Sequence, residues 1–345
     1  MMRQDFSDDR VSHRTAPRRP LTLLTLVGAA ALLSACNSTA QEGESVADAA
    51  PACDRACLIK TTDDYIAGLV AHQANGVPLA DDVAMVEDLK RVTPGQGLWQ
   101  TASAGPSSFS IHVPDEQNQT AGWIGMMERS GEPVLVALRL KLEDGRITEA
   151  EHLTTGIQDA NMQRMQTPRP GLLAEVPADA RLPHDELIRI GASYYDALDD
   201  NDGSLMPFAE DCERHENGMI TAGPGPSVGA GPNNNTAPIA RDCAGQLTSK
   251  VMSYITTIDN RRVFAADPVT GLVMGLSHFR HPMDFEPYEV TALDGSKIMY
   301  GKDRLPFEPF DLPAAHVYKI GADGKVHEIE AMGFMAPLNS PTGWE

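Results

Sequence analysis

A hairpin pattern that occurs twice restricts the folds open to this chain more than any other feature. Residues 134–155 contain two runs of alternating apolar and polar residues around Asp144-Gly145, and residues 315–333 repeat the pattern around Asp323-Gly324. An Asp-Gly pair between two alternating runs predicts a β-hairpin, since glycine accepts the positive φ that the turn requires. The second occurrence indicates an internal repeat.

The segments around the two hairpins follow the same order. Apolar residues at helical spacing predict helices over 58–75, 187–198 and 247–259, while alternating runs predict strands over 83–86, 122–128, 261–266 and 271–280. Residues 206–212 match residues 77–83 position by position, including the proline of a turn. Residues 105–121 and 282–313 look irregular. We therefore expect two α+β domains, 53–166 and 184–345, joined by a linker over 167–183.

The amino-terminal region has the features of an export signal. Residues 1–20 are polar and basic, residues 21–33 are apolar, and Leu33-Ser34-Ala35-Cys36 follows. Thirteen apolar residues are too few for a helix that spans about 30 Å of hydrocarbon. The segment resembles a bacterial lipoprotein signal, which implies a signal peptide over 1–35, a lipidated Cys36 and a flexible tether over 36–52. The implied location is the cell envelope, facing the periplasm or the exterior; the alternative is an ordinary cleaved signal with an incidental cysteine.

Four cysteines remain after Cys36, and an exported protein meets an oxidising compartment. Four cysteines allow three pairings. We favour Cys53 with Cys57 and Cys212 with Cys243, although Cys53 and Cys57 could also be separate thiols, because an i, i+4 pair in a helix needs distortion to form a disulfide.

Charge and motifs exclude several classes of function. The net charge of −20 argues against nucleic acid or an anionic lipid surface as a partner. The expected contact with a membrane is therefore through the lipid anchor alone. No nucleotide-binding fingerprint, hydrolase elbow or zinc-ligand spacing occurs, and the acidic run at 199–203 lacks calcium-loop ligands. We expect no cofactor and no metal.

The order of helices and strands resembles the nuclear transport factor 2-like or SnoaL-like cone, in which helices pack on a curved antiparallel sheet. The chain also resembles an uncharacterised secreted family with two such halves, through the following residues: Cys53-Asp54-Arg55-Ala56-Cys57-Leu58, Ala209-Glu210-Asp211-Cys212, Glu216-Asn217-Gly218, the DNRRV run at 259–263, Ile329-Glu330-Ala331, Pro337 and Thr342-Gly343-Trp344. This resemblance spans residues 53–345 and implies two tandem cones. A cone of this kind leaves an apolar pocket between its sheet and its helices, and the sequence does not tell whether the first cone keeps that pocket open. Related enzymes, such as ketosteroid isomerase, scytalone dehydratase and polyketide cyclases, transfer protons in that pocket without a cofactor, while other relatives only bind.

Polar candidates for such a pocket lie in the second half. We expect His215 as a general base, Arg280 or Tyr254 as stabilisers of an oxyanion, and His278 beside them. The candidate ligand-binding residues are Tyr194, Tyr195, His316 and Tyr318. Alternation along the strands puts His215 with Glu213 and Arg214 with Glu216 on opposite faces, and His278 with Arg280 on one face. Each histidine, taken singly, could equally be an ordinary hydrogen-bonded strand residue.

The first half lacks a counterpart of His215, since Val86 occupies that position, so we expect it to act as a support. His72 and His112 read as surface or capping residues.

Two functions follow from these residues. The first is a lipid-anchored protein that binds a small, largely apolar molecule in the second cone. The alternative is a cofactor-free lyase, isomerase or cyclase that uses proton transfer in that pocket. One geometric feature distinguishes the two functions. The enzyme requires that at least two of four side chains meet in one enclosed pocket: His215, His278, Tyr254 and Arg280. The oligomeric state does not follow from the sequence.

Overall fold

The computed structural model describes residues 52–224 and 239–345, and these belong to one compact unit that extends from Ala49 to Glu345. The predicted signal peptide, Cys36 and nearly all of the tether lie outside the described residues. Among the described residues, no helix is both long enough and apolar enough to cross a membrane. The domain boundaries expected from the sequence stay predictions, because this single unit contains both halves.

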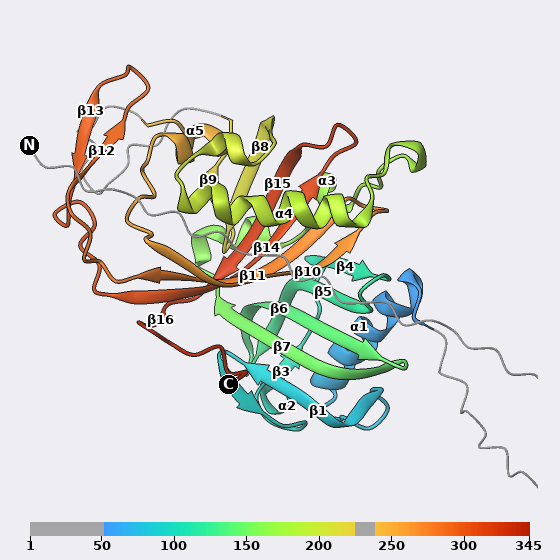
Figure 1. The fold of residues 1–345 in the computed structure, drawn as a ribbon. Helices are drawn as coiled ribbons and strands as arrows, with labels where there is room; N and C mark the ends of the chain where they lie inside the picture. Colours follow the sequence, from blue (N-terminus) through green and yellow to red (C-terminus); the bar gives the residue numbers. More distant parts are fainter. Residues whose placement is uncertain (1–51, 225–238) are drawn as a thin grey trace, which may run out of the picture. The chain divides into compact units, whose positions relative to one another are not determined.

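The first half is a helix on a seven-stranded sheet (Figure 1). Its elements are α1 (Arg55–Val70), β1 (Leu79–Glu87), β2 (Lys90–Val92), α2 (Leu98–Thr101), β3 (Ala102–Ala104), β4 (Ser110–Asp115), β5 (Thr120–Arg129), β6 (Glu132–Glu143) and β7 (Arg146–Gly156). The strand order is β2-β1-β7-β6-β5-β3, with β4 also paired to β5. Helix α1 begins at Asp54, whose side chain accepts a hydrogen bond from the Cys57 amide. Apolar residues of α1 that recur at helical spacing are buried against the sheet: Leu58, Tyr65, Ile66 and Leu69.

The connecting segment contains η1 (Asp159–Met165), α3 (Pro170–Leu173) and η2 (Ala178–Ala180). The second half consists of α4 (His184–Asp199), η3 (Gly203–Leu205), β8 (Phe208–Glu216), β9 (Met219–Ala222), α5 (Cys243–Thr248), β10 (Thr257–Asp267), β11 (Leu272–His281), β12 (Tyr288–Thr291), β13 (Lys297–Tyr300), β14 (Phe310–Ile320), β15 (Val326–Gly333) and β16 (Ala336–Pro337). Its seven-stranded sheet has the order β10-β11-β14-β15-β8-β9, with β16 on β14, while β12 and β13 pair separately.

The two halves repeat one another strand by strand. In each, the strand that follows the proline turn runs parallel to the second strand of the Asp-Gly hairpin, whereas the other neighbours pair antiparallel. The amide of Ile147 donates to the carbonyl of Pro78, and the amide of Val326 donates to that of Pro207. The two hairpins therefore belong to separate sheets of the same design. The predicted α+β class and the repetition of one arrangement in two halves, each with helices packed on its own sheet, are confirmed.

Each sheet has an inner face, covered by its own helix, and an outer face. The outer faces pack against each other in one apolar cluster to which both halves contribute, including Ile124 and Leu135 from the first and Leu276 and Val317 from the second. Gly122 is needed at this contact, because a Cβ there would lie 2.6 Å from the sulfur of Met274. The halves are thus joined through a common core as well as through the chain.

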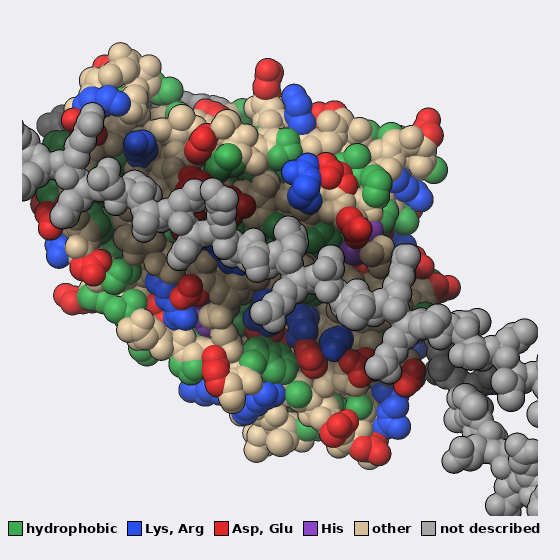
Figure 2. Space-filling view, viewed as in Figure 1, with side chains coloured by type: hydrophobic (Ala, Val, Ile, Leu, Met, Phe, Trp, Pro, Cys, Tyr) green, Lys and Arg blue, Asp and Glu red, His purple; other side chains and the backbone are tan. Residues whose placement is uncertain are grey.

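Ion pairs reinforce the contact between the halves. Arg262 on β10 forms two hydrogen bonds to Glu151 on β7, at 2.6 and 2.8 Å. Arg55 on α1 pairs with the buried Asp267 at 2.9 Å. On the face shown in Figure 2, Asp and Glu side chains are interspersed with Lys and Arg, so the negative net charge does not gather in one patch of that face.

Three predicted segments differ from the structure. Residues 105–121 were expected to be a loop but contain β4, which pairs along its length with β5. The helix expected over 247–259 is shorter, because α5 ends at Thr248 and β10 begins at Thr257. The irregular stretch 282–313 includes the small hairpin β12–β13. In each case the pairing partner is distant or the apolar run is short, so periodicity in the sequence is a weak signal.

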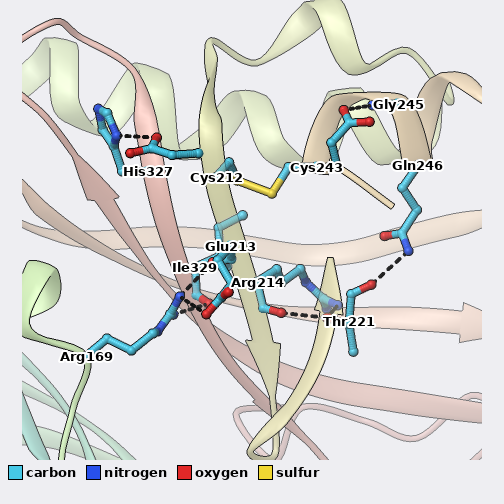
Figure 3. Close-up of a disulfide and its surroundings, with 12 residues drawn as sticks. Arg169, Cys212, Glu213, Arg214, Thr221, Cys243, Gly245, Gln246, His327 and Ile329 are labelled. Carbon is cyan, nitrogen blue, oxygen red and sulfur yellow. Dashed lines mark hydrogen bonds and ion pairs between the residues drawn. A yellow bond between two sulfur atoms is a disulfide. The ribbon is translucent and has the colours of Figure 1, made fainter. Parts of the chain in front are cut away.

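The predicted disulfides are confirmed. Cys53 pairs with Cys57 and Cys212 pairs with Cys243, with Cα atoms 5.3 and 6.0 Å apart respectively. The second bond joins β8 to the start of α5 (Figure 3). Helix α5 is therefore fixed over the inner face of the second sheet.

Candidate functional site

The second half encloses a cavity of about 100 Å³ between the inner face of its sheet and helices α4 and α5. Its walls come from α4, β8, α5 and the turn that follows it, β11, β14 and β15. The lining residues are Tyr194, Leu198, Arg214, Glu216, Gln246, Leu247, Met252, Tyr254, Ile255, Phe279, His281, Leu312, Ala314, His316, Ala331 and Met332. Most of this wall is apolar or aromatic, and its polar groups are few, which is typical of a small-molecule site.

Alternation along β8 determines which charged groups reach the cavity. Arg214 and Glu216 point inward and hydrogen-bond to each other, and Arg214 also donates to the Thr221 hydroxyl at 2.7 Å. Figure 3 shows Arg214 reaching toward Thr221, while Arg169 approaches β8 from its other side near Glu213. The cavity therefore contains a cation and an anion that neutralise each other.

His316 on β14 is one of two buried imidazoles in the cavity wall, with 1% of its surface exposed; the other is His281 on β11. Burial and the nearby Arg214 charge hold the pKa of His316 well below its usual range. Its Nδ1 atom has no hydrogen-bond partner among the described residues. The ring stacks on Tyr318 with centroids 5.9 Å apart and lies 5.2 Å from the ring of Tyr194. His316 is thus a neutral imidazole held by aromatic rings.

The predicted catalytic residues do not meet in this cavity. Only Tyr254 lines it, and burial raises the pKa of Tyr254 to about 12. His215 points to the outer face of the sheet, where its Nε2 lies 2.7 Å from Glu213. Arg280 is bound to Asp311 and Asp259. His278 shares the face of Arg280, and burial together with the Arg280 charge lowers the pKa of His278. The condition set for a catalytic pocket is therefore not met by these four residues, and their catalytic roles stay predictions.

The predicted ligand-binding residues lie closer to the cavity. Tyr194 and His316 line it directly. Tyr195 and Tyr318 stand behind them, each with its ring centroid 5.9 Å from that of His316. Both of their hydroxyl groups are buried and have no hydrogen-bond partner among the described residues.

The choice of face on β8 is what sequence reasoning missed. Alternation correctly separated Arg214 and Glu216 from His215 and Glu213, but it did not say which pair points inward. The disulfide determines which pair points inward. Cys212 bonds to Cys243 at the start of α5, which covers the inner face, so Arg214 and Glu216, at i+2 and i+4 from Cys212, share that face. His281 was also absent from the candidate residues. It lies three residues after His278 on β11, so its side chain points to the other face of the sheet and lines the cavity.

The interior of the first half is filled at the corresponding place. Val86 occupies the place of His215 in the strand register, but His152 on β7, which was not among the candidate residues, is fully buried in this interior. Its Nε2 lies 2.8 Å from the Tyr65 hydroxyl, and its Nδ1 lies 3.0 Å from a carboxylate oxygen of Glu87. Glu87 pairs with His152 as Glu216 pairs with Ala331 in the second half. The second half thus has a methyl group, at the cavity wall, where the first has a ring.

Metal binding finds no support in the part of the chain that the structure describes. Over residues 52–224 and 239–345, no three His, Cys, Asp or Glu side chains are arranged to hold a metal ion.

Comparison with known proteins gives one family and several solved structures. A family model described as a domain of unknown function (DUF8021) matches residues 180–333. No curated protein matches the chain.

The similar solved structures include two candidate enzymes and one nuclear transport factor 2-like protein. A candidate polyketide cyclase from Silicibacter is 14% identical, covers 44% of this chain and 92% of its own, and has a TM-score of 0.25. A candidate ketosteroid isomerase from Kribbella flavida is 16% identical, covers 35% and 90%, and has a TM-score of 0.23. A nuclear transport factor 2-like protein from Burkholderia thailandensis is 18% identical, covers 44% and 92%, and has a TM-score of 0.22.

Proposed function

We propose that the second half binds a small, neutral, largely apolar molecule in the cavity beneath α4. The observation that carries this proposal is the cavity wall itself. Aromatic and aliphatic side chains surround one mutually neutralised Arg214–Glu216 pair and two uncharged imidazoles, His281 and His316. Such a wall excludes water from an apolar ring and leaves a polar group to fix its orientation.

The size of the cavity limits the ligand. An engineered apolar cavity of about 150 Å³ holds one benzene molecule. The cavity here is about 100 Å³, so the part of a ligand that enters it is a single ring or a short branched group. A fused-ring substrate would require α4 or α5 to move.

The charges of the cavity favour a neutral ligand. Arg214 is neutralised by Glu216, and His316 carries no charge, so a charged ligand group would be buried without a counter-ion. Burying an unpaired charge is far costlier than burying a hydroxyl that finds a hydrogen bond. A hydroxyl or amide group next to His316 meets this condition.

Phenol tests the proposal, because it is a neutral ring with one hydroxyl. Calorimetric titration of the purified protein should give a dissociation constant of about 1 mM or below, which corresponds to about −4 kcal/mol. Ala331→Leu fills the cavity, as His152 fills the first half, and should weaken binding at least about tenfold. Ala322→Leu, in the exposed β14–β15 turn, should bind as the wild type does. Unchanged affinity in a folded Ala331→Leu protein would place the binding site elsewhere.

Proton transfer is the second candidate function, and one observation supports it. His316 lines the cavity, and its Nδ1 atom has no hydrogen-bond partner among the described residues, so it is placed to take a proton from a bound ligand. This assignment moves the base from His215 to His316. Mass spectrometry of the titrated ligand separates the two functions, since an altered ligand indicates catalysis and an unaltered one indicates binding.

We also propose that the protein is exported and anchored by a lipid on Cys36. The support is the Leu33-Ser34-Ala35-Cys36 sequence after an apolar run, together with two disulfides, which form in oxidising compartments. Mass spectrometry of the mature amino terminus from the native host should find Cys36 as the first residue, with a diacylglycerol on its sulfur. An unmodified terminus upstream of Cys36 would contradict this proposal.

A further inference from the structure

A second hollow adjoins the cavity. This groove of about 310 Å³ lies between the β8–β9 turn, the ends of β14 and β15, and residues 155–161 of the connecting region. Two residues, Glu216 and Leu312, line both the groove and the cavity. Met332 lines the cavity, and its chain neighbour Gly333 lines the groove. The two spaces are therefore separated by little more than the Glu216 and Leu312 side chains.

The groove has an apolar part that is open to water. Met219 and Met335 line it and are 53% and 64% exposed, which makes them two of the few large apolar side chains that are exposed in the described part of the chain. Leu312 and Phe334 also line the groove, and Leu312 lines the cavity as well. Exposed apolar side chains that gather at one hollow are typical of a site that is covered when a ligand binds.

The floor of the groove is held in place before any ligand arrives. Asn217 adopts a positive φ of 49°, and its side-chain amide exchanges two hydrogen bonds with the backbone of Gly333, at 2.9 and 3.2 Å. Asn161 donates to the carbonyl of Asn217 at 3.3 Å, which ties the connecting segment to the same turn. A preformed floor lowers the entropy that a ligand loses on binding.

The dividing wall can open at one side chain. Among the described residues, Glu216 has a single hydrogen-bond partner, Arg214, whereas Arg214 is also held by Thr221. The Glu216 side chain is 23% exposed, and only its Oε2 atom is bonded to Arg214, so the carboxylate can shift toward water while that bond is kept. Such a shift would join the groove to the cavity and leave Arg214 neutralised.

We infer that the ligand is a neutral amphiphile, with a compact hydrogen-bonding head in the cavity and a short apolar chain in the groove. This inference rests on the proposed function and adds the second compartment. The cavity alone is smaller than an ordinary small-molecule site, and the groove supplies the volume that the cavity lacks.

Phenol and 4-pentylphenol test the inference, because they share a head and differ by five carbons. A fully buried methylene adds about fourfold in affinity. A groove that stays partly open to water should add about half of that free energy, or roughly twofold per carbon. We expect 4-pentylphenol to bind the full-length protein about 30-fold more tightly than phenol in calorimetric titrations.

Two double variants test where the pentyl chain of the ligand lies. Met219→Asp with Met335→Asp places two charges in the groove and should reduce the ratio of the two affinities below about threefold. Leu293→Asp with Met299→Asp changes side chains of similar exposure on the β12–β13 hairpin and should leave the ratio near 30-fold.

The outcomes separate this inference from the proposed function. If phenol binds but the longer ligand gains nothing, the groove is not part of the site and the cavity assignment survives. If the gain persists in the groove variant, the chain lies elsewhere and the inference is wrong. If neither ligand binds, the proposed function fails and the inference falls with it.

Discussion

Glu330 on β15 is a buried carboxyl group on the outer face of the second sheet. Arg169 approaches it at 3.3 Å, and the same guanidinium also pairs with Glu213 and Glu328. The Nδ1 atom of His215 lies 4.0 Å from the Glu330 carboxylate. Burial raises the pKa of Glu330 to about 7, although the Arg169 charge opposes this rise. The folded protein therefore keeps a proton on Glu330 at pH values where the unfolded chain, with a pKa near 4.5, has lost it. The contribution of Glu330 to the free energy of unfolding is therefore fully present below about pH 4.5 and is lost as the pH rises through about 7.

Glu330→Gln should remove this dependence, because an amide does not ionise. Relative to the wild type, the free energy of unfolding of the variant should improve by on the order of 2 kcal/mol between pH 5 and pH 8. Urea denaturation at the two pH values measures it. Glu210→Gln, which is exposed on the neighbouring strand β8, is the control and should show no such change. Equal shifts in both variants would mean that Glu330 does not titrate in this range.

Among the secondary-structure elements, the two hairpins and the helices α1 and α4 could be predicted from the sequence. Their signals are local: an Asp-Gly turn between alternating runs, or apolar residues at helical spacing above a cap. Asp144 and Gly145 adopt the positive φ values, 48° and 73°, that such a turn requires. Strand β4 was not predictable in this way, since residues 110–115 gain their strand geometry from pairing with β5.

Strand β8 shows why the candidate site was predicted only in part. Periodicity of two assigns side chains to two faces but cannot say which face is inside, so His215 was preferred over Arg214 on chemistry alone. The deciding fact is a contact between distant segments, the bond from Cys212 to the helix that covers the inner face. His316 and Tyr194, the candidate ligand-binding residues on a hairpin strand and a facing helix, line the cavity, and their role in binding stays a prediction.

The packing of the two sheets, back to back, is a property that neither half shows alone. Strands β5 and β11 are buried along nearly their whole length on both faces, unlike a sheet strand with one face in water. The sequence has continuous apolar runs at 121–127 and 271–276, which are typical of strands buried on both faces. We predict strands there but not their burial on both faces. One face of each serves the interior of its own half, and the other forms the common core.

This arrangement gives the two copies different tasks. The first half is filled by the rings of Trp99, Trp123, Tyr65 and His152, and it supports the outer face of the second sheet. The second half has an alanine where the first has His152, and its interior retains space. Duplication thus supplies one packed copy as a scaffold and one hollow copy as the proposed site.

A crystal structure of the protein soaked with 4-iodophenol would test this account most directly, since anomalous scattering locates the iodine atom without ambiguity. The account predicts an iodine peak between α4 and the inner face of the second sheet, on the side of Glu216 and Leu312, with the phenol hydroxyl beside His316. A peak beside His152 in the first half, or peaks on the surface alone, would contradict it.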